Sequence, residues 1–210
     1  MKTSWKTVVA ILSVWFLLAF GAAYLHLFSN GANRIGAAVG VAAIVPLVLF
    51  ALWFSFSDKF RRFALSLNPR TITAVQVWRI IGFIFVLLEA RNVLPAAFAL
   101  PAGYGDMFIG ATAAFVAWKF ADSEHRGLFV LWQFLGIADL ATAVSLGTTA
   151  FLLAPQGPST VPMTVLPLSL IPTFLVPLFA MLHIICIAQA RSWKSTSSRE
   201  RSFTVQPQAI

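Results

Sequence analysis

Six long apolar stretches, separated by short polar segments, cover most of this chain. The hydrocarbon core of a bilayer is about 30 Å thick, and a helix of roughly 20 apolar residues crosses it. The stretches comprise residues 7–27, 35–56, 72–94, 103–120, 128–147 and 162–189. We therefore expect an all-α integral membrane protein with six transmembrane helices.

The composition supports a single membrane domain. Hydrophobic residues make up 59% of the chain and charged residues 10%, whereas about 25% of residues are charged in a typical soluble domain. We expect a short cytoplasmic N-terminus, residues 1–6, and a six-helix transmembrane domain, residues 7–190. The basic, polar residues 191–210 are expected to form a disordered cytoplasmic tail.

The positions of the basic residues predict the orientation, because cytoplasmic segments of membrane proteins are enriched in Lys and Arg. With the N-terminus in the cytoplasm, only Arg34 and Arg91 lie on the outer side, and Arg79 lies within the third stretch. We therefore expect a multi-pass protein of the plasma (inner) membrane with both termini cytoplasmic. The cytoplasmic segments then hold twelve bases: Lys2, Lys6, Lys59, Arg61, Arg62, Arg70, Lys119, Arg126, Arg191, Lys194, Arg199 and Arg201.

The net charge of +8 is spread over several short loops and the tail. This distribution favours contacts with the lipid bilayer and its anionic inner-leaflet lipids, at about 1 kcal/mol per base near the surface, and we expect no nucleic-acid partner. The sequence contains no Walker loop, HExxH, GxSxG or dinucleotide fingerprint. It therefore indicates no cofactor.

Eight polar residues within or beside the stretches form the candidate site. A charged side chain at the centre of a transmembrane helix costs about 2.5–3.5 kcal/mol, so it must be partnered, neutral or hydrated. Such groups are functional candidates, although a buried ion pair can also serve only to fix helix register. The candidates are Gln76, Arg79, Glu89, Arg91, Asn92, Asp106, Asp139 and His183.

Helical phase divides the third stretch into two polar faces. At 100° per residue, Gln76 and Arg79 share one face with Phe83. Glu89 and Asn92 project from the other side, near the outer end. One helix is thus predicted to offer an inner polar face and a separate outer one.

Depth limits which charges can meet. Counting residues from the predicted ends of the stretches, Arg79 and Asp139 differ in depth by roughly 8–10 Å. The long Arg stem could partly close that gap by snorkelling. Arg91 and Asp106 both lie near the outer surface and could pair there, or remain solvated.

His183 lies near the inner end of the last stretch. It shares a helix face with Cys186, but two ligands are too few for a structural zinc site, and we expect no metal. His183 is expected to bond helix carbonyls or Gln189. Alternatively, it joins Gln76 and Arg79 in an inner proton relay.

The segment Leu94–Asp106, LPAAFALPAGYGD, links the third and fourth stretches. Its two Leu-Pro steps are expected to end one helix and delay the next until Gly103. Asp106 would then lie in the first helical turn, where a carboxylate caps free N–H groups. A short re-entrant hairpin over an outward-facing site is the alternative.

Residues 103–106 spell GxGD, which resembles the motif around one catalytic aspartate in intramembrane aspartyl proteases of the presenilin and prepilin-peptidase type. The resemblance covers four residues. It implies a second aspartate that shares a water with Asp106, one acid being protonated and the other ionised. Asp139 is the deep candidate, but it follows the motif, whereas those families place the partner aspartate before it.

Proline and small residues shape the packing. Prolines recur every fifth residue from Pro162 to Pro177, and each interior proline removes a backbone hydrogen bond. The last span is therefore expected to be kinked, or broken beside a hydrated cavity. Gly36 and Gly40 form a GxxxG pair, a spacing that permits close helix contacts. Asp106 and Asp139 each lie on a stripe of small residues, which should face other helices.

These features favour a permease for a small solute or ion, in which proton coupling would use the deep carboxylate. A non-catalytic assembly factor or partner subunit is the first alternative, because the charges could all be register-setting pairs. An intramembrane aspartyl-type protease is the second, and enzymatic activity is the less favoured class. The sequence indicates neither the solute nor the direction of transport.

Overall fold

The computed structural model describes residues 2–29, 36–153 and 157–193. Within these ranges the chain contains helices and no strands. Arg34 and residues 194–210 of the expected disordered tail lie outside the described residues. The elements are α1 (Lys2–Tyr24), α2 (Ala37–Phe56), α3 (Asp58–Leu65), α4 (Pro69–Ala74), η1 (Val75–Gly82), α5 (Phe83–Ala90), α6 (Ala96–Lys119), α7 (Arg126–Leu153), η2 (Val161–Thr164), η3 (Ile171–Leu175) and α8 (Val176–Arg191).

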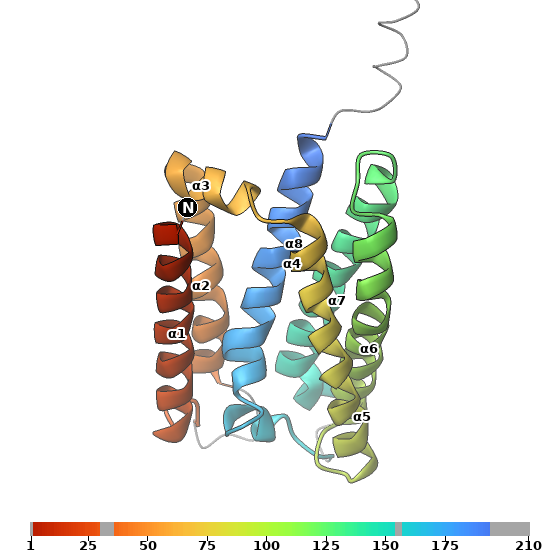
Figure 1. The fold of residues 1–210 in the computed structure, drawn as a ribbon. Coiled ribbons are helices and arrows are strands. Elements are labelled where there is room, and N and C mark those ends of the chain that lie inside the picture. Colours follow the sequence, from red (N-terminus) through yellow and green to blue (C-terminus); the bar gives the residue numbers. More distant parts are fainter. Residues whose placement is uncertain (1, 30–35, 154–156, 194–210) are drawn as a thin grey trace, which may run out of the picture.

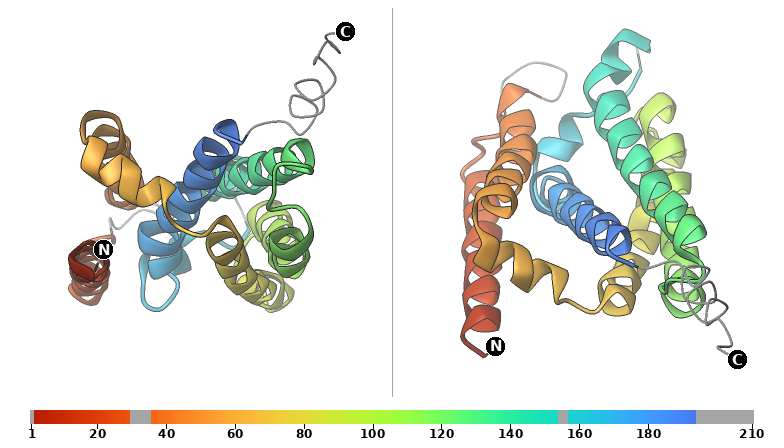
Figure 2. Two further views of the ribbon diagram at one scale, coloured as in Figure 1. Left: turned by 45° about the horizontal axis from the view of Figure 1, so that its top comes forward. Right: turned by 90° about the horizontal axis from the view of Figure 1, so that it is seen from above.

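The long helices run alternately up and down, so the start of α1 and the end of α8 lie at the same end of the bundle (Figure 1). We name this the terminal end, and the opposite one the far end. Seen from the terminal end, α8 is central, with α1 and α2 on one side and α4 to α7 on the other (Figure 2). The short helix α3 lies across the terminal end and stacks Phe60 on Trp53 of α2, with ring centroids 4.1 Å apart.

Five segments of the described chain are long and apolar enough to cross a membrane. Many of their apolar side chains, such as Leu17, Leu18 and Val48, are exposed, as lipid-facing residues would be. These features agree with the predicted class, a helical multi-pass membrane protein. The helix α6 has 24 residues but is not one of these five apolar segments. The five segments are Lys6–Tyr24, Ala37–Phe56, Pro69–Ala90, Arg126–Ala150 and Ile171–Arg191.

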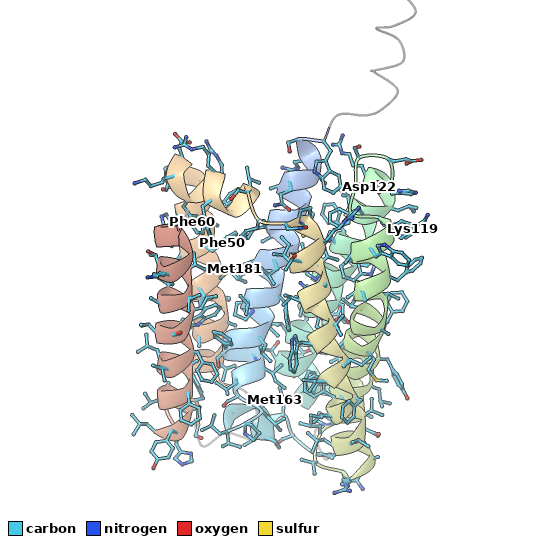
Figure 3. All side chains as sticks on the ribbon, in the orientation of Figure 1. Phe50, Phe60, Lys119, Asp122, Met163 and Met181 are labelled. Carbon is cyan, nitrogen blue, oxygen red and sulfur yellow. The ribbon has the colours of Figure 1, made fainter. Side chains whose placement is uncertain are left out.

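Two apolar clusters fill the bundle at different heights. One includes Phe50 and Phe129 and lies toward the terminal end; the other includes Phe98 and Met163 and lies toward the far end. Figure 3 labels Phe50 and Met163 at these two heights. Arg79, Asp106 and Asp139 lie on the helices between the two clusters.

The third span is one continuous rod made of α4, η1 and α5, and its middle eight residues are 3-10 helix. A 3-10 helix has three residues per turn, so side chains three apart lie in line. Gln76, Arg79 and Gly82 follow this period and are the buried residues of η1. The predicted shared face with Phe83 is wrong, because Phe83 is exposed and the period is three rather than 3.6.

The fourth helix begins at Ala96 rather than at Gly103, so the predicted start is wrong. Pro101 lies inside α6, near its N-terminus. Proline has a φ angle suited to a helix and removes only one early hydrogen bond there, so the helix continues. Asp106 lies in the third turn and not the first, which rules out the capping role. The predicted re-entrant hairpin is likewise absent, since α6 is continuous through this segment.

The last span is interrupted, as the prolines predict. The 3-10 turn η2 is followed by turns, by the π-helical η3 and then by the regular helix α8. Local hydroxyls add bonds to carbonyls of this span: the Thr164 hydroxyl donates to Val161 O at 2.8 Å, and the Thr173 hydroxyl donates to Ser169 O at 2.7 Å. The Ile171 N–H donates to Leu168 O at 3.0 Å.

A glycine on α6 allows this helix to pack closely against η1. A Cβ atom on Gly110 would lie 2.9 Å from the carbonyl carbon of Arg79, so α6 packs directly on the backbone of η1. The predicted close contact at the GxxxG pair is wrong. Gly36 precedes α2, and the space beside Gly40 holds no atom within 4 Å of an added Cβ.

We predict that Gly110→Ala destabilises the protein, because the methyl group would overlap the backbone of η1. Overpacking of this kind costs about 1–3 kcal/mol, measured by thermal or denaturant unfolding in mild detergent. Gly127→Ala on α7 is the control, because an added Cβ there meets nothing within 4 Å. Equal stability of the two variants would contradict the close packing.

Candidate functional site

Arg79 binds two carboxylates at the centre of the bundle. Its Nε donates to Asp106 Oδ1 at 2.7 Å, and its Nη2 donates to Asp139 Oδ2. The Arg79 side chain is 1% exposed, against 15% for Asp106 and 14% for Asp139. We name these three residues the Arg79 cluster. It joins η1, α6 and α7 through charge-assisted hydrogen bonds, the strong class of such bonds.

The expected gap in depth between Arg79 and Asp139 is therefore wrong. Each 3-10 residue rises about 2.0 Å, against 1.5 Å in an α-helix. Arg79 thus lies about 17 Å beyond the start of α4. Asp139 lies about 20 Å beyond the start of α7, and Asp106 about 20 Å before the end of α6. The start of α4 at Pro69, three residues before the expected start of the third span, and the longer rise of η1 bring Arg79 to nearly the level of the two aspartates.

The other nitrogen of the guanidinium reaches α7 and α8. Nη1 of Arg79 donates to Gly136 O at 3.3 Å and to His183 Nε2 at 3.2 Å. Four acceptors from three helices thus surround one buried guanidinium. The expected bond of His183 to Gln189 or to a helix carbonyl is wrong, because its ring nitrogens bind Arg79 and Gln133. Gln189 instead donates to the carbonyls of Leu65 and Leu67.

A line of hydrogen bonds continues from His183, and its direction follows from Arg79. Because a guanidinium only donates, Nε2 of His183 must accept, and Nδ1–H must donate to Gln133 Oε1 at 2.6 Å. The Gln133 amide then donates to Thr73 Oγ1 at 3.2 Å. Thr73 Oγ1 also lies 3.5 Å from Cys186 Sγ, a contact in which either group can donate. We name these five residues the His183 relay; its histidine is the neutral Nδ1–H tautomer.

Two glycines make room for these side chains. A Cβ atom on Gly105 would overlap Oδ1 of Asp139, and one on Gly136 would overlap the imidazole of His183. Gly105 belongs to the GxGD segment, so that glycine is explained by the approach of α7. The motif resembles that of the proteases, but here a guanidinium binds both aspartates, in place of the shared water that such an enzyme needs.

A cavity of about 60 Å³ adjoins the cluster. Asp106 lines it together with apolar residues of α2, α5, α7 and the interrupted last span. Val144 and Thr148 on its border are exposed, so the cavity is open on that side. Its lining residues come from the far half of the bundle, where Met163 is labelled in Figure 3. One carboxylate of the cluster therefore faces an apolar cavity.

The remaining predicted residues lie elsewhere. Gln76 donates to Phe179 O at 3.3 Å, and its Oε1 has no hydrogen-bond partner among the described residues. Arg91 and Asn92 are exposed and Glu89 is half-buried near the end of α5. Asn92 adopts a φ of 54°, which ends that helix. The proposed pair of Arg91 with Asp106 is wrong, because Asp106 binds Arg79.

Three residues of the site were missed by the sequence analysis: Thr73, Gln133 and Gly136. A signal for two of them was present. Gln133 is the one amide in an otherwise apolar stretch, and it precedes Asp139 by six residues. Thr73 precedes Arg79 by the same spacing, in the helix α4 that continues into η1. Within the described ranges, no three His, Cys, Asp or Glu side chains are placed to hold a metal ion.

Comparison with known families places most of this chain in one of them. Residues 34–191 match the model of the family described as "Domain of unknown function (DUF8737)", so the chain belongs to that family. The matched region contains the Arg79 cluster and the His183 relay. No curated protein and no solved structure matches the chain.

We predict that Gln133→Leu destabilises the protein by about 1–3 kcal/mol, because it leaves the buried Nδ1–H of His183 without an acceptor. Thr73→Val should be coupled to it by about 0.5–3 kcal/mol in a double-mutant cycle, since the two residues share a hydrogen bond. Unfolding in mild detergent measures both effects. The control is Thr142→Val, whose exposed hydroxyl bonds only to its own helix. If the changes in unfolding free energy of the two single variants simply add in the double variant, the hydrogen bond between Gln133 and Thr73 is contradicted.

Proposed function

We propose that this member of the family is a multi-pass permease of the plasma (inner) membrane for a small solute or ion, coupled to the movement of protons. The observation that carries the proposal is the position of Asp106. Its carboxylate belongs to a buried three-charge cluster and also lines a cavity. An ionisable group so placed within membrane helices is a functional candidate by default.

The charge of the Arg79 cluster supports coupling to protons. With both carboxylates ionised, the guanidinium balances only one of them, and the cluster carries one surplus negative charge. An unbalanced charge among apolar helices is costly, so a proton or a cationic solute stabilises the site by neutralising it. In this scheme Asp139 accepts the proton, Asp106 faces the solute, and Arg79 supplies the counter-charge.

The distribution of bases supports six crossings with both termini in the cytoplasm. Besides the five apolar segments, α6 is taken as a further crossing, because it connects α5 to α7 and runs along the same axis (Figure 1). Described bases at the terminal end then mark the cytoplasmic side and contact anionic lipids. They are Lys6, Lys59, Arg61, Arg62, Arg70, Lys119, Arg126 and Arg191.

The full set of hydrogen-bond acceptors around Arg79 favours a second candidate, a partner subunit or assembly factor without transport activity. Four acceptors bind the guanidinium, which would suffice for a cluster that only fixes the register of the helices. The two candidates differ in the fate of a variant that replaces the whole cluster by apolar residues. Since Asp106 also binds Arg79, that variant is the triple change Arg79→Leu, Asp106→Leu and Asp139→Leu.

We predict that Asp139→Asn lowers solute-driven proton movement at least tenfold. Proteoliposomes loaded with a pH-sensitive dye are challenged with gradients of aliphatic amines, amino acids, sugars and inorganic ions. The wild type should change the internal pH with at least one class. Glu124→Gln, on an exposed loop outside the cluster, should retain the wild-type rate.

Unchanged proton movement in Asp139→Asn would remove the proposed role of that carboxylate. Wild-type movement in the folded triple-Leu variant would assign the cluster a purely structural part. Thermal unfolding of each variant, recorded alongside, separates a lost activity from a lost fold.

We predict opposite accessibility of the two ends of the bundle. Ser66→Cys lies in the exposed turn between α3 and α4, and Asn92→Cys lies in the exposed turn between α5 and α6. In intact cells a membrane-impermeant maleimide should label Asn92→Cys and not Ser66→Cys, while the buried Cys186 stays unlabelled. The reverse pattern would overturn the orientation.

A further inference from the structure

We propose that the cavity beside Asp106 binds a small aliphatic ammonium ion, with the nitrogen against the carboxylate and the carbon chain between α2 and α7. The inference rests on the proposed function, since it names the class of solute that this permease would recognise. It follows from three properties of the cavity: its size, its lining and the charge next to it.

The size of the cavity limits the solute to a few heavy atoms. A water-sized group needs roughly 10–15 Å³ of such volume. The cavity of about 60 Å³ therefore has room for about four groups of that size. Propylammonium, with three carbons and one nitrogen, fits this limit.

The lining selects an organic solute over an inorganic ion or a sugar. Asp106 and Thr148 are the polar side chains among the lining residues, and the others are apolar or glycine. Metal cations in proteins are held by six or more oxygen ligands, or by four nitrogen or sulfur ligands. Sugars carry many hydroxyls that would lose their hydrogen bonds here. A short hydrocarbon chain instead gains from contact with such walls.

The charge of the Arg79 cluster selects a monovalent cation. Asp106 uses Oδ1 for Arg79, and no described residue donates a hydrogen bond to its Oδ2. One ammonium group can donate to that free oxygen and neutralise the surplus charge of the cluster. An anion would meet a carboxylate in an apolar cavity, and a neutral alcohol would leave the charge unbalanced.

Gly40 provides the space for the hydrocarbon chain. It lines the cavity from α2, and a Cβ atom added there meets nothing within 4 Å. A larger side chain can therefore enter the cavity without disturbing the helices. This makes Gly40→Val a variant that blocks the site while leaving the fold and the Arg79 cluster in place.

The test is calorimetric titration of the full chain in lipid nanodiscs with propylammonium chloride. We expect saturable binding of propylammonium and at least tenfold weaker binding of propanol and propionate, which also contain three carbons but lack the positive charge. Equal affinity for propanol would overturn the assigned charge selectivity. Absence of any propylammonium binding would overturn the site.

Variants locate the bound ion. Gly40→Val should weaken binding at least tenfold, and Asp106→Asn should do the same by removing the charge. Gly21→Val on α1 is the matched control, because an added Cβ there also meets nothing within 4 Å and Gly21 does not line the cavity. Full affinity in Gly40→Val, with the wild-type melting temperature, would contradict the location.

The binding experiment and the transport experiment test the two proposals independently. Binding that is lost in Gly40→Val, without proton movement in proteoliposomes, supports the site and overturns the permease. Proton movement that depends on Asp139 and is driven by another solute class, without propylammonium binding, supports the permease and overturns the ammonium assignment.

Discussion

A guanidinium buried among membrane helices needs acceptors on every side, and the centre of this bundle depends on that requirement. Asp106 on α6, Asp139 on α7 and His183 on α8 all reach Arg79 on η1. Removing one partner of a buried charge costs about 3–5 kcal/mol. Sliding any of these helices by one turn would break such a contact. Arg79 thereby fixes the mutual register of four segments that apolar packing alone would leave less defined.

The 3-10 segment η1 makes this arrangement possible. An α-helix would rotate Gln76, Arg79 and Gly82 apart, whereas the three-residue period aligns them toward α6 and α8. The poorer hydrogen-bond geometry of a 3-10 run is a cost that the contacts of Arg79 offset. Apolar clusters lie above and below the Arg79 cluster, so its three charges occupy one thin level of the bundle. Glycines such as Gly105 let the helices approach closely enough at that level.

The sequence predicts the helical membrane class and the interrupted last span because apolar length and proline content are local properties. It also identifies Arg79, Asp106 and Asp139, since charges in apolar stretches stand out. Their joint contact could not be predicted, because it depends on the rise of η1 and on the start of α6 seven residues before Gly103. Gln133 was missed since one amide in an apolar run gives no indication of its partner. Function, topology and solute stay proposals.

The one-way order of donors in the His183 relay has a consequence for access. A proton moving from Thr73 toward Arg79 would have to reverse the donors of Gln133 and His183, and it would end at a guanidinium that accepts none. With its donors in this order, the His183 relay does not carry protons toward Arg79. The apolar cluster that includes Phe129 lies toward the terminal end from these groups. In the proposed permease, exchange of protons with the terminal side would therefore require the helices to repack around the guanidinium.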